Sequence, residues 1–322
     1  MTGWPERKRL SRMKARPIRR VLQAAVLGII LYFLFQNLRD NWQKVAEYEW
    51  RFDIPCLMLS LLALCTVMGG MIPIWRVILR GMGYDLTMGK AWRIWFISNL
   101  GRYVPGKVWQ VTGMIYMCEK EGIPKRVTAV SVILAQALST LSAAGLFGLY
   151  IVLEGRRIDP VWTYSIGGLL IAGGIAVHPW VLERALNFTL RLLRRDPIRI
   201  EFKFGQLLYI TGLYTLSWCG YGLALYVFIS SLASVSMNLI WALIPIHAMA
   251  YTAGLLALLA PGGLGVREGA LTFFLSAHLP FALATLSALL SRVWFTAAEI
   301  LCLAVAAGVG RGQTLKTPSV RS

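Results

Sequence analysis

The sequence is poor in charged residues and poorest in acids. Only 15% of its 322 residues are charged, and 15 Asp and Glu stand against 33 Lys and Arg. Hydrophobic residues make up 57% of the chain, more than the roughly 45–50% of an average soluble domain. No polar or Ser/Pro-rich linker separates two halves. These features exclude a pair of soluble domains and predict one all-α integral membrane domain, a polytopic helix bundle.

Histidine and paired cysteine are also scarce. The five cysteines lie in or beside apolar segments without a CxxC spacing, and the three histidines are scattered. This pattern indicates neither a disulfide framework nor a metal site. The chain also has no Walker loop, HExxH motif, nucleophile elbow or Asp-rich pair for a Mg²⁺-bound diphosphate. We therefore expect no metal, no cofactor and no enzymatic activity.

Runs of about twenty apolar residues are long enough to cross the hydrocarbon of a membrane. The first run follows a basic N-terminus and has no clear small-residue cleavage site, so it is expected to be a retained helix. The predicted spans are residues 21–38, 55–79, 128–152, 161–181, 206–232 and 282–309.

The distribution of cations predicts the orientation. Residues 1–20 contain eight Lys and Arg against one acid, and residues 183–205 contain six against three. The tail 310–322 contains Arg311, Lys316 and Arg321 and no acid. Because Lys and Arg concentrate on the cytoplasmic side, we expect both termini in the cytoplasm of a multi-pass protein of the cell membrane. The net charge of +18 is explained in the same way, and no nucleic-acid partner is expected.

Two further regions, 91–118 and 238–279, each have a Pro-Gly at the centre. The orientation requires the first to enter and leave on the cytoplasmic side and the second on the outer side, so both are predicted to be re-entrant. A complete crossing by 238–258 remains the alternative, because 22 residues are long for half of a re-entrant loop.

An internal repeat agrees with this topology. At an offset of 156 positions, Pro105 aligns with Pro261, Gly106 with Gly262 and Pro124 with Pro280. An odd number of crossings between the two regions predicts inverted repeats, about 21–152 and 161–309, within one domain at 21–309.

The first break, SNLGRYVPGKVWQ at residues 98–110, is a candidate anion site. Broken backbone at membrane depth is tolerated only against protein or a water-filled cavity. The arm after Pro105 begins with unpaired amides, among them those of Gly106 and Lys107, and Arg102 lies just before it. Amides and cations together favour a phosphate. The alternative is that Arg102 and Lys107 extend to the membrane surface.

The second break, LLAPGGLGVREGAL at residues 258–271, repeats the pattern with Gly262 and Gly263 and then Arg267 and Glu268. Arg292 and Glu299 follow on the last span, and we expect Glu268, Arg292 and Glu299 to be supporting charges. Glu268 could instead serve only to neutralise Arg267 or Arg292.

The motifs GRYVPGKVW and PGGLGVREGAL, in a chain of this length and hydropathy, resemble the flippase-like membrane domain of lysylphosphatidylglycerol synthases and its stand-alone relatives. The resemblance implies movement of a lipid between leaflets: aminoacylated phospholipid in the synthases, and glycolipid, polyprenyl-linked or hopanoid pathways in stand-alone members. The 322 residues include no soluble acyltransferase-like domain, so we expect no aminoacylation by this chain. Its PGKVWQ turn also departs from the glycine-rich turn and following acid of the synthases, which argues against assuming a lysyl lipid.

We therefore expect translocation of a lipid with an anionic headgroup, which is a phospholipid, a glycolipid or a polyprenyl-phosphate-linked lipid. The alternative is a non-catalytic membrane partner or scaffold of a lipid or glycan synthesis enzyme. The two differ in one structural respect. A transporter should line one cavity with polar residues from both motifs, whereas a scaffold can leave them in separate contacts.

Overall fold

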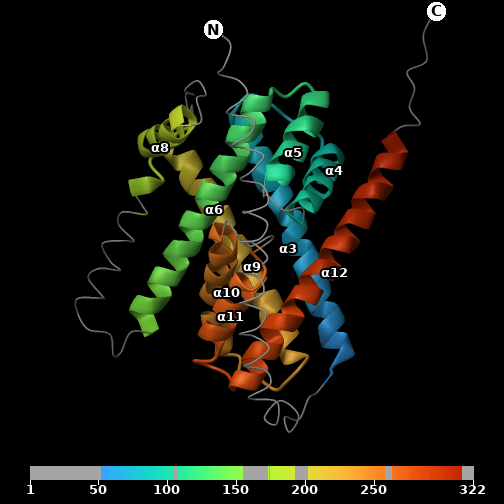
Figure 1. Ribbon diagram of the computed structural model, residues 1–322, viewed down its shortest axis with the longest axis vertical. Coiled ribbons are helices and arrows are strands. Elements are labelled where there is room, and N and C mark those ends of the chain that lie inside the picture. Colours follow the sequence, from blue (N-terminus) through green and yellow to red (C-terminus); the bar gives the residue numbers. More distant parts are fainter. Residues whose placement is uncertain are drawn as a thin grey trace, which may run out of the picture.

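The computed structural model describes residues 52–103, 108–154, 173, 175–192, 202–257 and 263–313, and the regular structure in these ranges is helical. Five of the described helices are long and apolar enough to cross a membrane (Figure 1). They are α3 (Ile54–Gly81), α6 (Lys125–Glu154), α9 (Phe204–Ser230), α10 (Leu239–Leu256) and α12 (Phe281–Gln313). The protein is therefore a multi-pass helical membrane protein.

Local sequence sets the ends of these helices. The Asp53 side chain accepts a hydrogen bond from the Cys56 amide at the start of α3, where Pro55 occupies the first turn. The same helix ends in a turn that contains Gly83 at φ +83°. Pro124 and Pro280 come directly before α6 and α12, because proline needs no amide partner at a helix start.

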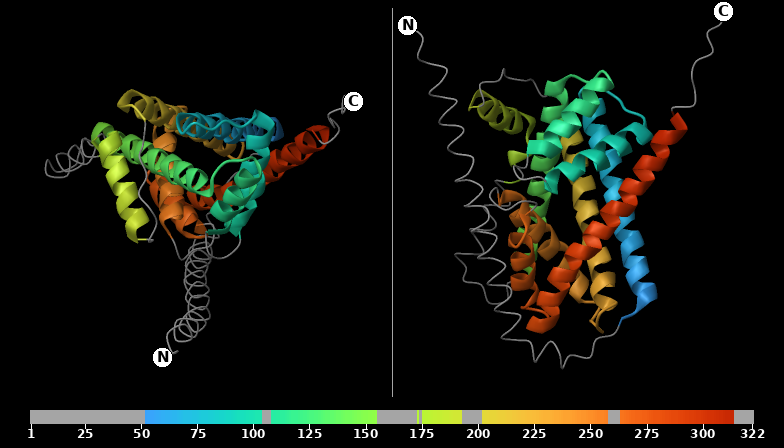
Figure 2. Two further views of the ribbon diagram at one scale, coloured as in Figure 1. Left: turned by 90° about the horizontal axis from the view of Figure 1, so that it is seen from above. Right: turned by 45° about the vertical axis from the view of Figure 1, so that its right-hand side comes forward.

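Two helical hairpins complete the bundle. The first joins α4 (Met88–Asn99), the short 3-10 helix η1 (Leu100–Tyr103) and α5 (Val108–Lys120), and the second joins α10 to α11 (Val266–Leu275). Figure 1 and the right-hand view of Figure 2 show α4 and α5 in the upper half of the bundle and α10 and α11 in the lower half. The two hairpins therefore lie in opposite halves of the bundle.

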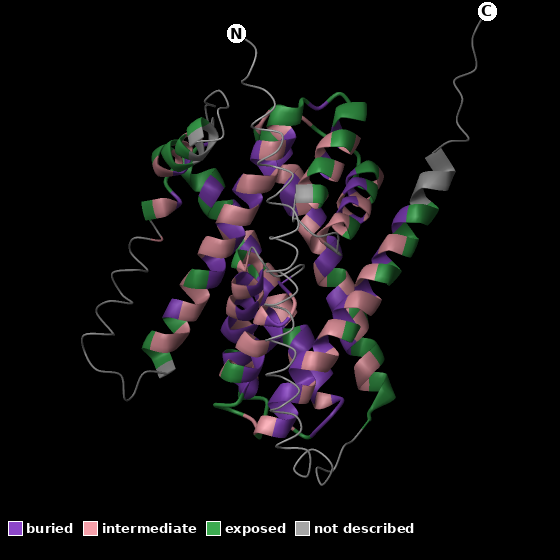
Figure 3. Cartoon of the chain, in the orientation of Figure 1, coloured by how far each residue is buried: buried purple, intermediate pink, exposed green. Residues whose placement is uncertain are grey.

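The core lies between α3, α9 and the surrounding helices, and buried faces run along the inside of the bundle (Figure 3). Two indole groups join α6 to its neighbours: Trp75 donates to Ser131 Oγ at 3.1 Å, and Trp218 donates to Ser142 Oγ at 3.1 Å. Large apolar side chains such as Leu62, Leu216 and Val293 are more than half exposed. An apolar exterior of this kind is suited to contact with lipid tails.

The predicted spans 55–79, 128–152 and 282–309 each fall in one of the long helices, and the span 206–232 runs two residues past the end of α9. Span 21–38 and most of span 161–181 lie outside the described residues. The last residues of 161–181 belong to α8 (Pro179–Leu192), which occupies much of the stretch expected to be a cytoplasmic linker. The first arm of region 238–279 is α10, which is long and apolar enough to cross. The re-entrant character of both regions stays a prediction.

The helix bounds agree with the 156-residue offset. Helix α6 begins at Lys125 and α12 at Phe281, and 281 − 125 = 156. By the same offset α4 falls on α10 and α5 falls on α11. The inverted repeat stays a prediction that this correspondence supports.

Candidate functional site

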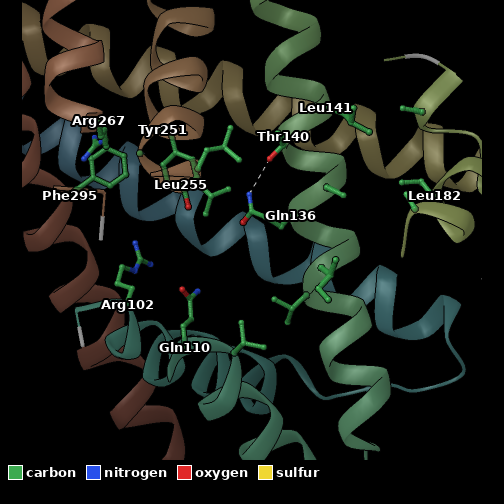
Figure 4. A pocket seen from close by; sticks show the side chains of 18 of the residues that line it. Arg102, Gln110, Gln136, Thr140, Leu141, Leu182, Tyr251, Leu255, Arg267 and Phe295 are labelled. Atoms are coloured by element: carbon green, nitrogen blue, oxygen red, sulfur yellow. Dashed lines mark hydrogen bonds between the residues drawn. The ribbon is translucent and has the colours of Figure 1, made fainter. Parts of the chain in front are cut away.

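A cavity of about 710 Å³ lies where the two hairpins meet α6, α8 and α12. Its walls are mostly apolar, with polar and charged side chains gathered on part of the lining. Figure 4 shows that Arg102, Gln110, Gln136 and Tyr251 point toward a common space from different elements. The polar and charged lining residues are Arg102, Gln110, Gln136, Thr140, Tyr251, Arg267, Arg292, Thr296 and Glu299.

Arg102 reaches the cavity from η1 at the tip of the first hairpin. Its guanidinium pairs with the Glu299 carboxylate of α12 at 2.6 Å, and its Nε donates to the Asn99 carbonyl at 3.3 Å. The Arg102 side chain is 26% exposed, and that of Glu299 is 12% exposed. A ligand anion at Arg102 would therefore share this cation with a carboxylate that already neutralises it.

Arg267 reaches the same cavity from the first turn of α11. Its side chain is 7% exposed, and its guanidinium lies over the Phe295 ring at 4.3 Å from the centroid. The carboxylate of Glu268 is 3.9 Å away, too far for a hydrogen bond. The Nε and one terminal nitrogen of Arg267 have no hydrogen-bond partner among the described residues. A buried cation with unused donors has a strong capacity to bind an anion.

Glu268 is held by the backbone and lies near two arginines. Its Oε2 accepts from the Gly265 amide at 2.7 Å, at the start of α11. Its Oε1 is 3.9 Å from Arg267 and 3.7 Å from Arg292. One buried carboxylate therefore balances two neighbouring guanidinium groups without closing a tight pair with either.

The site residues predicted from sequence divide into three groups. Four of them line the one cavity: Arg102, Arg267, Arg292 and Glu299. Glu268 is not a lining residue, but its carboxylate lies within 4 Å of Arg267 and Arg292. Gly263 is buried in the hairpin tip and is not a lining residue. The remaining three, Gly106, Lys107 and Gly262, lie outside the described residues.

Glycines let the hairpin arms approach each other. A Cβ at Gly263, where φ is +69°, would lie 2.6 Å from the Gly254 carbonyl oxygen. A Cβ at Gly254 would lie 2.9 Å from Arg267 Cβ, so this close contact sets how deeply Arg267 sits. In the first hairpin, a Cβ at Gly101 would lie 2.5 Å from the Gln110 amide nitrogen. Gly101, Gly254 and Gly263 thus allow the two arms of each hairpin to pack closely.

Sequence reasoning missed the uncharged polar lining. Gln136 and Thr140 are one turn apart on α6 and hydrogen-bonded at 3.4 Å, and Gln110 of α5 donates to Asn99 at 2.6 Å. Tyr251 adds a phenol from α10. The glutamine side chains inside apolar helices could have indicated this lining, because a buried amide without a hydrogen-bond partner is costly in a membrane.

The charges of the site leave a positive excess. Arg102, Arg267 and Arg292 carry three positive charges, and Glu268 and Glu299 carry two negative ones, so the described set has a net charge of one positive unit. The site combines that excess with a large apolar space. Such a combination suits an amphiphile with one negative charge.

A family model described as the lysylphosphatidylglycerol synthase transmembrane region matches residues 20–298. The matched stretch includes both hairpins and ends one residue before Glu299. The family is implicated in the handling of membrane lipids. A search of the curated proteins finds no match to the chain.

Proposed function

We propose that this chain, which belongs to the lysylphosphatidylglycerol synthase transmembrane-region family, moves an anionic lipid across the cell membrane. In this proposal the phosphate of the headgroup passes between the tips of the two hairpins, while the acyl or prenyl chains stay against apolar walls. The cargo is an anionic phospholipid, a glycolipid or a polyprenyl-phosphate-linked lipid.

One observation carries the proposal: arginines from both hairpins line one cavity of about 710 Å³ whose other walls are largely apolar. Arg102 and Arg267 belong to hairpins in opposite halves of the bundle, which supports a path that passes between them. A phosphodiester carries one negative charge, which balances the positive excess of the five charged groups. Arg binds phosphate well because its planar fork matches two oxygens at once.

The arrangement of the helices supports the same proposal. Two re-entrant hairpins from opposite faces, related by inverted repeats, would expose one central site alternately to each side. The 156-residue offset between the first residues of α6 and α12 agrees with such repeats. We propose that both termini are cytoplasmic, on the basis of the cation distribution. No covalent step is part of this proposal.

Reconstitution in vesicles tests the function. Fluorescent phosphatidylglycerol and fluorescent phosphatidylcholine with the same chains are placed in both leaflets, and a membrane-impermeant reductant destroys the outer fluorophores. We expect the protein to speed loss of the protected phosphatidylglycerol signal about tenfold or more over empty vesicles, and to act much less on the zwitterionic lipid.

The Arg93→Gln variant is the matched control, because Arg93 is an exposed cation of α4 outside the cavity. It should move phosphatidylglycerol at the unmodified rate. A well-folded protein that moves neither lipid would contradict the proposal and favour the scaffold alternative. Equal rates for both lipids would contradict the anion site.

A further inference from the structure

A second, smaller pocket of about 110 Å³ lies behind the arginine cavity. Arg102, Gln110, Gln136, Tyr251 and Phe295 line both spaces, so the two share a wall. Arg102 is the charged group on that wall. A phosphate held at Arg102 would lie between the two spaces, with room for the lipid chains in the large cavity and for a headgroup substituent in the small one.

Two buried polar side chains of the small pocket have no hydrogen-bond partner for their polar atoms among the described residues. His247 is 1% exposed, and neither of its ring nitrogens has a hydrogen-bond partner among the described residues. Its ring is stacked against Phe295 at 5.5 Å and against Tyr221 at 5.8 Å between centroids, which fixes its plane. Tyr214 is 2% exposed, and its hydroxyl also has no hydrogen-bond partner among the described residues.

Such groups are uncommon in folded proteins, because a buried donor or acceptor without a partner costs about 1–3 kcal/mol. Both residues line the small pocket. The polar atoms themselves are covered by neighbouring side chains, so a molecule bound there supplies their missing partners once those side chains shift.

The chemistry of the lining narrows the type of molecule. Among the described residues that line the small pocket there is no Asp or Glu, and Arg102 is the one residue with a fixed charge. An ammonium group on the headgroup would find no carboxylate in that lining, and Arg102, whose charge is balanced by Glu299, would offer it no attraction. Phenol, imidazole and amide groups instead both donate and accept, as hydroxyl groups do.

We propose that the small pocket is a headgroup site that recognises hydroxyl groups, through His247 and Tyr214, on the anionic lipid whose phosphate binds at Arg102. The preferred headgroups are polyols or sugars rather than aminoacyl groups. This inference deepens the proposed function, on which it rests for the lipid nature of the cargo.

Binding to the purified protein in detergent tests the site without requiring transport. Native mass spectrometry compares four short-chain lipids with the same tails: phosphatidylglycerol, phosphatidylinositol, phosphatidylmethanol and lysylphosphatidylglycerol. Phosphatidylmethanol keeps the negative charge and lacks the hydroxyls. We expect one of the two hydroxyl-bearing anionic lipids to bind about three- to tenfold more tightly than phosphatidylmethanol, the size of one or two net hydrogen bonds. Lysylphosphatidylglycerol should bind most weakly.

Three variants locate the effect. Tyr214→Phe removes one buried hydroxyl without changing the shape, and His247→Phe keeps an aromatic ring between Tyr221 and Phe295. Each should reduce the preference for the hydroxyl-bearing lipid over phosphatidylmethanol about three- to tenfold. Tyr209→Phe makes the same chemical change at an exposed position of α9 outside the pocket and should leave the preference unchanged.

The outcomes separate the two proposals. Equal binding of hydroxyl-bearing lipids and phosphatidylmethanol to the unmodified protein overturns the headgroup site, whether or not transport occurs. An equal loss of all lipids in Tyr214→Phe and His247→Phe, with melting temperature retained, also overturns it. Selective binding without lipid movement in vesicles overturns the proposed function and leaves the headgroup site standing. Glycerol 1-phosphate binding as tightly as phosphatidylglycerol would overturn the lipid part of the inference.

Discussion

The two hairpins present one arginine each to the same cavity, but they hold it in different ways. Arg102 of the first hairpin is partly exposed and closes a 2.6 Å pair with Glu299. Arg267 of the second is almost fully buried, lies on an aromatic ring and is 3.9 Å from the Glu268 carboxylate. The first arginine is already neutralised, whereas the second keeps unused donors. We infer that Arg267 gains most from an arriving phosphate and that Arg102 exchanges one partner for another.

The largest expected effect is on stability and comes from Glu268. Replacing Glu268 with Ala removes the carboxylate that balances Arg267 and Arg292 in a buried setting, which costs about 3–5 kcal/mol. We expect a strong fall in membrane yield and in the melting temperature in detergent. Glu299→Ala is the matched variant and should lower the melting temperature less, because the Arg102–Glu299 pair is more accessible to solvent. An equal fall in melting temperature in both variants would contradict the proposed difference between the two arginine sites.

The next effect separates the arginines in transport. Arg267→Gln removes charge-assisted contacts worth about 1.5–3 kcal/mol, so phosphatidylglycerol movement should slow about ten- to a hundredfold. Arg102→Gln should slow it only about three- to tenfold, since a phosphate at Arg102 replaces an existing carboxylate contact. The vesicle assay described above measures both at matched protein levels. Normal transport by well-expressed Arg267→Gln would contradict the phosphate site.

Sequence reasoning singled out Arg267 and Arg292 because ionisable groups inside apolar runs are conspicuous and require partners. It also identified the long spans, because their length and composition leave few alternatives. It could not find the Arg102–Glu299 pair, which depends on how the first hairpin leans against α12. His247 and Tyr214 were missed for a related reason: sequence shows a polar residue in a helix but not which space it faces.

Glycine substitutions test the tight packing of the second hairpin. Gly263→Ala puts a side chain at positive φ and against a carbonyl oxygen, so it should destabilise the protein by about 1–3 kcal/mol. Gly269→Ala is the control in the same hairpin, because its added Cβ would meet nothing within 4 Å. In a helix interior that change should stabilise slightly, by up to about 1 kcal/mol. Melting temperatures that fall equally in both variants would argue against a close-packed tip.

The smallest effect is expected outside both hairpins, in the turn between α3 and α4. The Arg80 guanidinium beside Asp85, helped by Arg76, holds the pKa of that carboxyl below its usual value. A lowered pKa in the folded protein gives stability that is present at neutral pH and is lost as the pH falls through the folded pKa. Because the turn is exposed, Asp85→Asn should lower the melting temperature only slightly at pH 7, and the difference should shrink as the pH falls through the lowered pKa of Asp85. A melting-temperature difference between the two proteins that grows on acidification would contradict a lowered pKa of Asp85.

The most direct measurement of the central claim is photo-crosslinking with an anionic lipid that carries a diazirine beside its phosphate. The account predicts labelled peptides from both hairpins, around Arg102 and around Arg267, and about a tenfold loss of that labelling in Arg267→Gln. Label confined to outward-facing positions such as Leu62 and Leu216, and unchanged in Arg267→Gln, would contradict a lipid path between the two hairpins.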